Sequence, residues 1–73
     1  MRMTYKEIFG ANLTRIMKEK GITQIQLVRE LGMPRRTVHN WQTGKCFPRY
    51  PDKICQLCEY LGVEFYELVT WLG

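Results

Sequence analysis

The sequence predicts an all-α domain of five short helices. Apolar residues recur at helical spacing in five segments, and Gly, Pro and Thr residues that favour helix ends stand between them. No segment shows the alternating apolar and polar pattern of a half-buried strand. A length of 73 residues suits a single core, since domains usually hold about 100–150 residues. We therefore expect residues 1–73 to form one domain.

The first two helices are marked by their apolar residues and their ends. Residues 5–20 carry one apolar stripe, followed by a glycine suited to a helix C-terminus. The stripe comprises Tyr5, Phe9, Leu13, Ile16 and Met17. Thr23 and Gln26 have the spacing of a capping box, which places a second helix at residues 23–31. Because this helix has only about two turns, it must be held by its neighbours.

Prolines open two of the remaining three helices. We expect the third at residues 34–43, because the fixed φ of Pro34 suits a first helical turn. Pro51 opens a fourth helix, residues 51–61, in the same way. A fifth helix is expected at residues 63–72, with acidic residues in its first turns.

Charge is distributed unevenly along the chain. The net charge is +4, but residues 1–53 hold all eleven basic residues and four acidic ones, and therefore carry +7. The last 20 residues hold three acidic residues and no basic one. Such polarity suggests that one end of the molecule faces a polyanion. No apolar run approaches the ~18 residues of a membrane span, and the first residues lack the apolar stretch of a signal peptide, so we expect a cytoplasmic protein.

The second and third helices form a candidate helix-turn-helix at about residues 23–43. The second helix of such a motif can enter the major groove of DNA, which is ~12 Å wide. Opposite the inward-facing Val38, the third helix points polar side chains outward. These are Arg36, His39, Asn40 and Thr43. Arg35 and Arg36 suit guanine and Asn40 suits adenine, although an ordinary solvated helix would also carry such residues.

Several short motifs occur in order along nearly the whole chain. They are Thr23-Gln24, the turn glycine Gly32, Trp41-x-x-Gly44-Lys45 and Leu61-Gly62-Val63. Together they resemble the phage-repressor, Cro-like (XRE) helix-turn-helix family. The resemblance implies a lambda-repressor-like fold of five helices and a transcriptional regulator, a repressor, that binds double-stranded DNA sequence-specifically. It also implies a homodimer. We expect association with the nucleoid and no cofactor, and no small-molecule ligand is evident from the sequence.

The resemblance assigns roles in DNA binding by position. The base-reading positions are Arg35, Arg36 and Asn40. Those expected at the DNA backbone, or in support of the reading helix, are Gln24, Thr37, His39, Thr43, Lys45 and Arg49. Gln24 matches a glutamine that contacts a phosphate and buttresses the reading helix. Lys45 and Arg49 can displace the counterions around the phosphates of DNA, whatever its base sequence. They are therefore expected to supply affinity for DNA in general. His39, as a lone histidine, also suits a solvated position.

The chain departs from the family at two paired positions. Many members have an arginine and a glutamate where this sequence has Met17 and Gln42. Because both partners are replaced, no buried charge is left unpaired. We expect Met17 to pack near Gln42. Pro34 replaces the usual Ser or Thr cap, which leaves the first turn of the third helix without a side-chain cap.

The cysteines suggest a different class of function. Cys46, Cys55 and Cys58, together with His39, are four nominal zinc ligands. However, Cys55 and Cys58 lie inside a helical apolar pattern, whereas structural zinc usually takes ligands from turns. We therefore expect no metal site, and a metal- or thiol-sensing regulator remains an alternative.

The last two helices raise the question of a protein partner. Phe65, Tyr66, Trp71 and Leu72 cannot all be buried by one stripe of a short helix, which leaves apolar area for a homodimer contact. Ile25 also lies off the inward stripe of its helix. An adaptor or antitoxin-like module on the same fold is an alternative, against which the base-reading residues argue. An enzyme is not expected, because the single histidine has no acid or nucleophile placed beside it.

Overall fold

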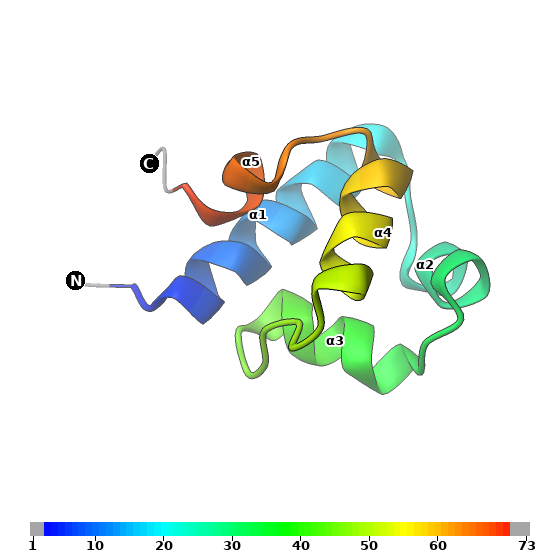
Figure 1. Cartoon of the computed structure of the whole chain (residues 1–73), viewed down its shortest axis with the longest axis horizontal. Helices are drawn as coiled ribbons and strands as arrows, with labels where there is room; N and C mark the ends of the chain where they lie inside the picture. The colour runs from blue at the N-terminus through cyan, green and yellow to red at the C-terminus, as the bar shows by residue number, and fades with distance from the viewer. Residues whose placement is uncertain (1–2, 71–73) are drawn as a thin grey trace.

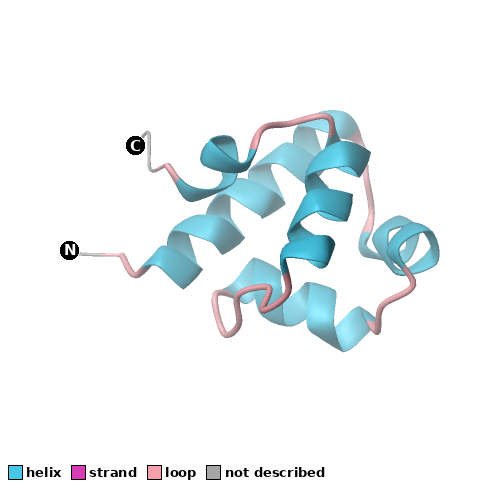
Figure 2. Ribbon diagram, viewed as in Figure 1, coloured by secondary structure: helices cyan, strands magenta, loops and turns pink. Residues whose placement is uncertain are grey.

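The computed structural model describes residues 3–70, and these residues form five α-helices and no strand (Figure 2). In chain order the helices are α1 (Tyr5–Lys20), α2 (Gln24–Leu31), α3 (Arg35–Thr43), α4 (Pro51–Leu61) and α5 (Phe65–Val69). The longest helix, α1, contacts α3, α4 and α5, whereas α2 packs against α3 and α4 (Figure 1). The expected all-α fold of five helices is confirmed. Within the described residues, no helix is long and apolar enough to cross a membrane.

One hydrophobic core joins all five helices. Its buried apolar residues are Phe9, Leu13, Ile16, Met17, Leu27, Met33, Val38, Trp41, Leu57, Leu61 and Leu68. The rings of Phe9 on α1 and Trp41 on α3 meet edge to face, with 6.2 Å between their centroids. Since most of these helices are too short to be stable alone, each depends on this shared core.

Helices α1 and α3 approach closely at Gly10. A β-carbon at this position would lie 2.6 Å from the carbonyl oxygen of Trp41 and 2.7 Å from that of Gln42. Any larger side chain would therefore push the two helices apart. The glycine allows the C-terminal half of α3 to rest directly on the backbone of α1.

Asn12 links α1 to the end of α5. Its side chain is buried, and its amide nitrogen donates hydrogen bonds to the carbonyl oxygens of Leu68, at 3.0 Å, and Thr70, at 2.9 Å. These carbonyls lie at a helix end, where intrahelical partners are missing. Asn12 therefore stabilises the point at which α5 ends.

Two helix boundaries differ from the sequence-based expectations. The third helix begins at Arg35 rather than Pro34, because Pro34 has an extended ψ of 144° and occupies the N-cap position without a side-chain cap. The fifth helix was expected at residues 63–72, which is wrong, since it spans only Phe65–Val69. The N–H of Glu64, the N-cap, donates to the Glu67 carboxylate at 2.7 Å, and Thr70 is extended. Trp71 and Leu72 lie outside the described residues.

Tyr5 also departs from the expected apolar stripe of α1. Its side chain is 60% exposed, so it is not part of the core. Its ring packs against that of Phe47 in a T-shaped arrangement, with 5.3 Å between the centroids. Tyr5 therefore covers the loop that follows α3.

Candidate nucleic-acid interface

The helix-turn-helix is formed by α2, the turn after Gly32, and α3. The N–H of Gln26 donates to the hydroxyl of Thr23 at 3.2 Å, and the N–H of Thr23 donates to the side-chain oxygen of Gln26 at 2.7 Å. This reciprocal pair is the expected capping box. At the other end, Gly32 has a left-handed φ of 63°, which ends the helix.

Lys53 holds the C-terminal end of α2 against α4. Its ammonium group donates to the carbonyl oxygen of Leu31 at 3.1 Å. A cation at this position also complements the partial negative charge of a helix C-terminus. Sequence reasoning missed this residue, because its partner lies 22 positions away and neither helix contains a local signal for the contact.

The two faces of α3 differ in burial as expected. Val38 and Trp41 are buried in the core. On the outward side, Arg36 and His39 are exposed and Asn40 is half-buried. Residues three or four positions apart share one side of a helix, so Arg36 and Asn40 form a polar ridge along α3.

The loop after α3 folds back onto the end of that helix. The N–H groups of Lys45 and Cys46 both donate to the carbonyl oxygen of Asn40, at 3.0 and 3.2 Å. The hydroxyl of Thr43, an exposed residue, donates to the same oxygen at 3.3 Å. These bonds hold Lys45 beside the C-terminal end of the polar ridge.

The rest of the loop is anchored by apolar residues and presents basic ones. Phe47 packs on Phe9, with 4.9 Å between the ring centroids, and Pro48 is buried. Lys45 and Arg49 are both exposed. Figure 1 shows α3 and this loop along one edge of the molecule, and the hydrogen bonds to Asn40 keep the loop beside the end of the polar ridge.

Arg35 and Gln24 meet between the two helices. The Nε of Arg35 donates to the side-chain oxygen of Gln24 at 3.1 Å. The amide of Gln24 donates in turn to the side-chain oxygen of Gln42 at 2.6 Å, and the amide of Gln42 approaches the sulfur of Met17 at 3.4 Å. The expected packing of Met17 near Gln42 is confirmed. Thr37, which was expected to support DNA binding, is half-buried on the flank of α3.

Comparisons with known proteins agree with this geometry. Residues 12–72 match the model of the Cro/C1-type HTH DNA-binding domain. The chain belongs to this family. An uncharacterised HTH-type transcriptional regulator of Sinorhizobium fredii, y4dJ, is 31% identical to this Cro/C1-type protein over 70 residues, which cover 93% of this chain and 87% of the relative.

A solved structure is also similar to this Cro/C1-type protein. It is that of the restriction-modification controller protein C.AhdI from Aeromonas hydrophila, with a TM-score of 0.76 and 27% sequence identity. The similarity covers 86% of this chain and 94% of that one. The Cro/C1-type protein is thus a DNA-binding transcriptional regulator with the expected lambda-repressor-like fold, a type of protein that is not normally an enzyme.

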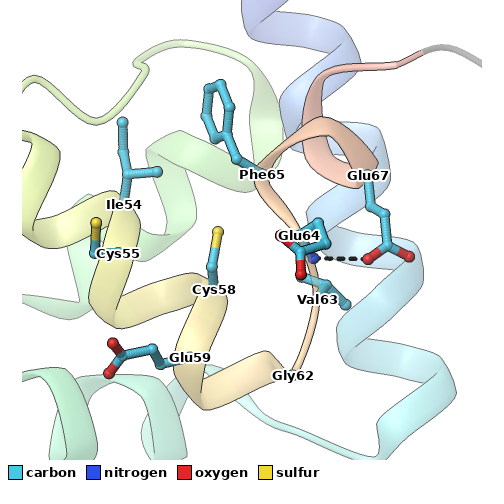
Figure 3. Close-up of a pocket in the computed structure, with 9 residues that line it drawn as sticks. All are labelled: Ile54, Cys55, Cys58, Glu59, Gly62, Val63, Glu64, Phe65 and Glu67. Carbon is cyan, nitrogen blue, oxygen red and sulfur yellow. Dashed lines mark hydrogen bonds between the residues drawn. The ribbon is translucent and has the colours of Figure 1, made fainter.

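The three cysteines of this Cro/C1-type protein lie in two different places. Cys46 is on the basic loop, whereas Cys55 and Cys58 line a hollow between α4 and α5 with Phe65 and Glu64 (Figure 3). Among residues 3–70, no three His, Cys, Asp or Glu side chains gather in a way that could hold a metal ion. Burial, followed by the charges of Cys55, Glu64 and Glu67, raises the pKa of Cys58. A thiol that stays protonated is a poor nucleophile and metal ligand.

Proposed function

We propose that this protein is a repressor that places α3 in the major groove of double-stranded DNA. The observation that carries the proposal is the contrast between the buried Val38 and Trp41 and the polar ridge of Arg36 and Asn40 on the other side of the same helix. Arg36 can donate two hydrogen bonds to O6 and N7 of guanine. Asn40 can form the corresponding pair with N6 and N7 of adenine.

The remaining site residues divide by the part of DNA that they contact. Arg35 is the third base-reading residue, since it extends from the first turn of α3. Lys45 and Arg49 contact phosphates from the basic loop, and such contacts add affinity for any sequence. Gln24, Thr37, His39 and Thr43 contact the DNA backbone or support the helix that reads the bases. The whole chain, residues 1–73, acts as one DNA-binding domain.

The protein acts as a homodimer through α5. Phe65 and Tyr66 are 43% and 64% exposed, which is a large apolar exposure for a helix of five residues. A two-fold dimer would place two α3 helices one turn of DNA apart, ~34 Å, over a symmetric site. Ile25 is also exposed, at 54%, on α2, which does not pack against α5 within the described residues.

Selection of bound sequences from a pool of random duplexes tests the proposal. We expect enrichment of one sequence with two inverted half-sites, separated by about one helical turn. Sedimentation of the protein with and without this duplex then measures the dimer. Tyr66→Glu should weaken the dimer, whereas Tyr50→Glu, an equally exposed tyrosine outside α5, should leave it unchanged. A pool without enrichment would contradict sequence-specific binding, and an enriched single half-site would contradict the dimer.

A further inference from the structure

A row of hydrogen bonds connects the core to the first turn of the reading helix. It begins at the sulfur of Met17, which is buried in α1, and passes through the side chains of Gln42 and Gln24 to Arg35. The three donor-to-acceptor distances are 3.4, 2.6 and 3.1 Å. Gln24 and Gln42 are half-buried, and only Arg35 is exposed. The row therefore runs from the interior to the DNA-binding surface.

The direction of every bond in this row is set by its two ends. A guanidinium group only donates, so Gln24 must turn its side-chain oxygen to Arg35 and its nitrogen to Gln42. Gln42 must then offer its oxygen to Gln24, which leaves its nitrogen facing Met17. The thioether sulfur of Met17 is a weak acceptor and has no hydrogen to donate. Each amide thus has one orientation that satisfies all its neighbours.

We propose that Gln42 is a positioning residue for DNA recognition, which holds Arg35 in place through Gln24. The proposal rests on the proposed DNA-binding function. If the oxygen of Gln42 is removed, the nitrogen of Gln24 loses its acceptor, and the Gln24 amide is free to rotate. A rotated amide would present its nitrogen to Nε of Arg35, and two donors cannot bond to each other. Arg35 would then leave this position.

The hydrogen bond from Nε of Arg35 to Gln24 leaves the two terminal nitrogens of the guanidinium available to a base. The two terminal nitrogens of a guanidinium can donate in parallel to O6 and N7 of guanine. With Nε bound to Gln24, the long side chain is restricted before DNA arrives, and less freedom is lost on binding. Gln42 thereby contributes to the preference for one base without touching DNA.

Single-base variants of the selected duplex provide the test. Gln42→Met keeps the shape of the side chain but removes its oxygen. We expect it to reduce the preference at the base pair read by Arg35 by at least about fivefold, the lower range for a good base contact. Preferences at the positions read by Arg36 and Asn40 should stay unchanged. Gln42→Glu, which still offers an oxygen to Gln24, should keep the preference, and Gln56→Met, at an exposed position of α4, is the matched control.

Coupling between residues separates positioning from a general loss of structure. Because Gln42 acts through Arg35, adding Gln42→Met to Arg35→Ala should cause no further loss of base preference. In the free protein, the Nε–H signal of Arg35 in a nitrogen-resolved NMR spectrum should shift in Gln42→Met and in Gln24→Met, but not in Gln56→Met. This second readout needs no DNA.

The possible outcomes distinguish this proposal from the one on which it rests. A wild-type protein that selects no sequence would overturn the DNA-binding proposal and this one together. A wild-type protein that selects a sequence, with Gln42→Met retaining both the full preference and the Arg35 signal, would overturn this proposal alone. Losses that add fully between Gln42→Met and Arg35→Ala would also contradict it.

Discussion

Replacing Met17 by arginine should strongly destabilise the domain. Met17 is 3% exposed, and its sulfur lies 3.4 Å from the side-chain nitrogen of Gln42. A guanidinium introduced here would face a donor, because the oxygen of Gln42 is already bound to Gln24 at 2.6 Å. A buried charge left without a partner costs ~3–5 kcal/mol. Since each kcal/mol shifts the melting temperature of a domain this small by ~4–8 °C, we expect a fall of roughly 12–40 °C.

Thermal unfolding followed by circular dichroism, together with urea titration, measures this effect. Met17→Leu, which keeps the residue apolar and nearly the same size, should cost less than ~1.5 kcal/mol and serves as the control. The double variant Met17→Arg with Gln42→Glu supplies a carboxylate beside the new cation. It should be clearly more stable than Met17→Arg alone. The reasoning is refuted if Met17→Arg melts at or above the wild-type temperature, or if the added carboxylate restores nothing.

Substitutions at three further positions test other contacts of the fold. Gly10→Ala places a β-carbon 2.6 Å from the carbonyl oxygen of Trp41, so urea unfolding should show a loss of ~1–3 kcal/mol, and an unchanged midpoint would contradict the close approach of α1 and α3. Asn12→Ala should lose ~1–3 kcal/mol by the same measurement, because the carbonyls at the end of α5 lose their donor. Asn12→Asp should lose more at neutral pH, because it places a carboxylate against those carbonyls; equal losses would show that this amide is not the donor. The pKa of Glu7 is lowered below 4.5 by hydrogen bonds from Thr4, so its contribution to stability is present above that pH and is lost as the pH falls through the lowered value. Glu7→Gln should therefore lose less stability than the wild type on acidification, and parallel pH curves would contradict this.

Local signals in the sequence were sufficient to predict most helix ends. Thr23 and Gln26 cap each other within one turn, so the start of α2 was predictable from four consecutive residues. The packing of Met17 near Gln42 was expected from the resemblance to the family, because many members have a charged pair at these two positions. The capping residues are close together in the sequence, whereas this second expectation depends on the family pattern.

Contacts between distant residues were not predictable in this way. Helix α5 ends earlier than its apolar pattern suggests, and its final carbonyls bind Asn12, more than 50 positions away. Lys53 appears in the sequence as one more basic residue, yet it binds the last carbonyl of α2. Arg35 was expected to read a base, but the hydrogen bond from its Nε to Gln24 of the preceding helix was not foreseen. In each case the partner is brought close by the packing of helices, which local patterns do not encode.

Affinity of the Asn40→Ala variant for two duplexes tests most directly whether the outward ridge of α3 reads bases. The two duplexes are the selected sequence and a scrambled one of equal length, compared at one fixed salt concentration. We expect Asn40→Ala to lose ~1–3 kcal/mol on the selected duplex and almost nothing on the scrambled one, whereas Lys45→Ala weakens binding to both alike. Equal losses of Asn40→Ala on the two duplexes would contradict base reading by this ridge.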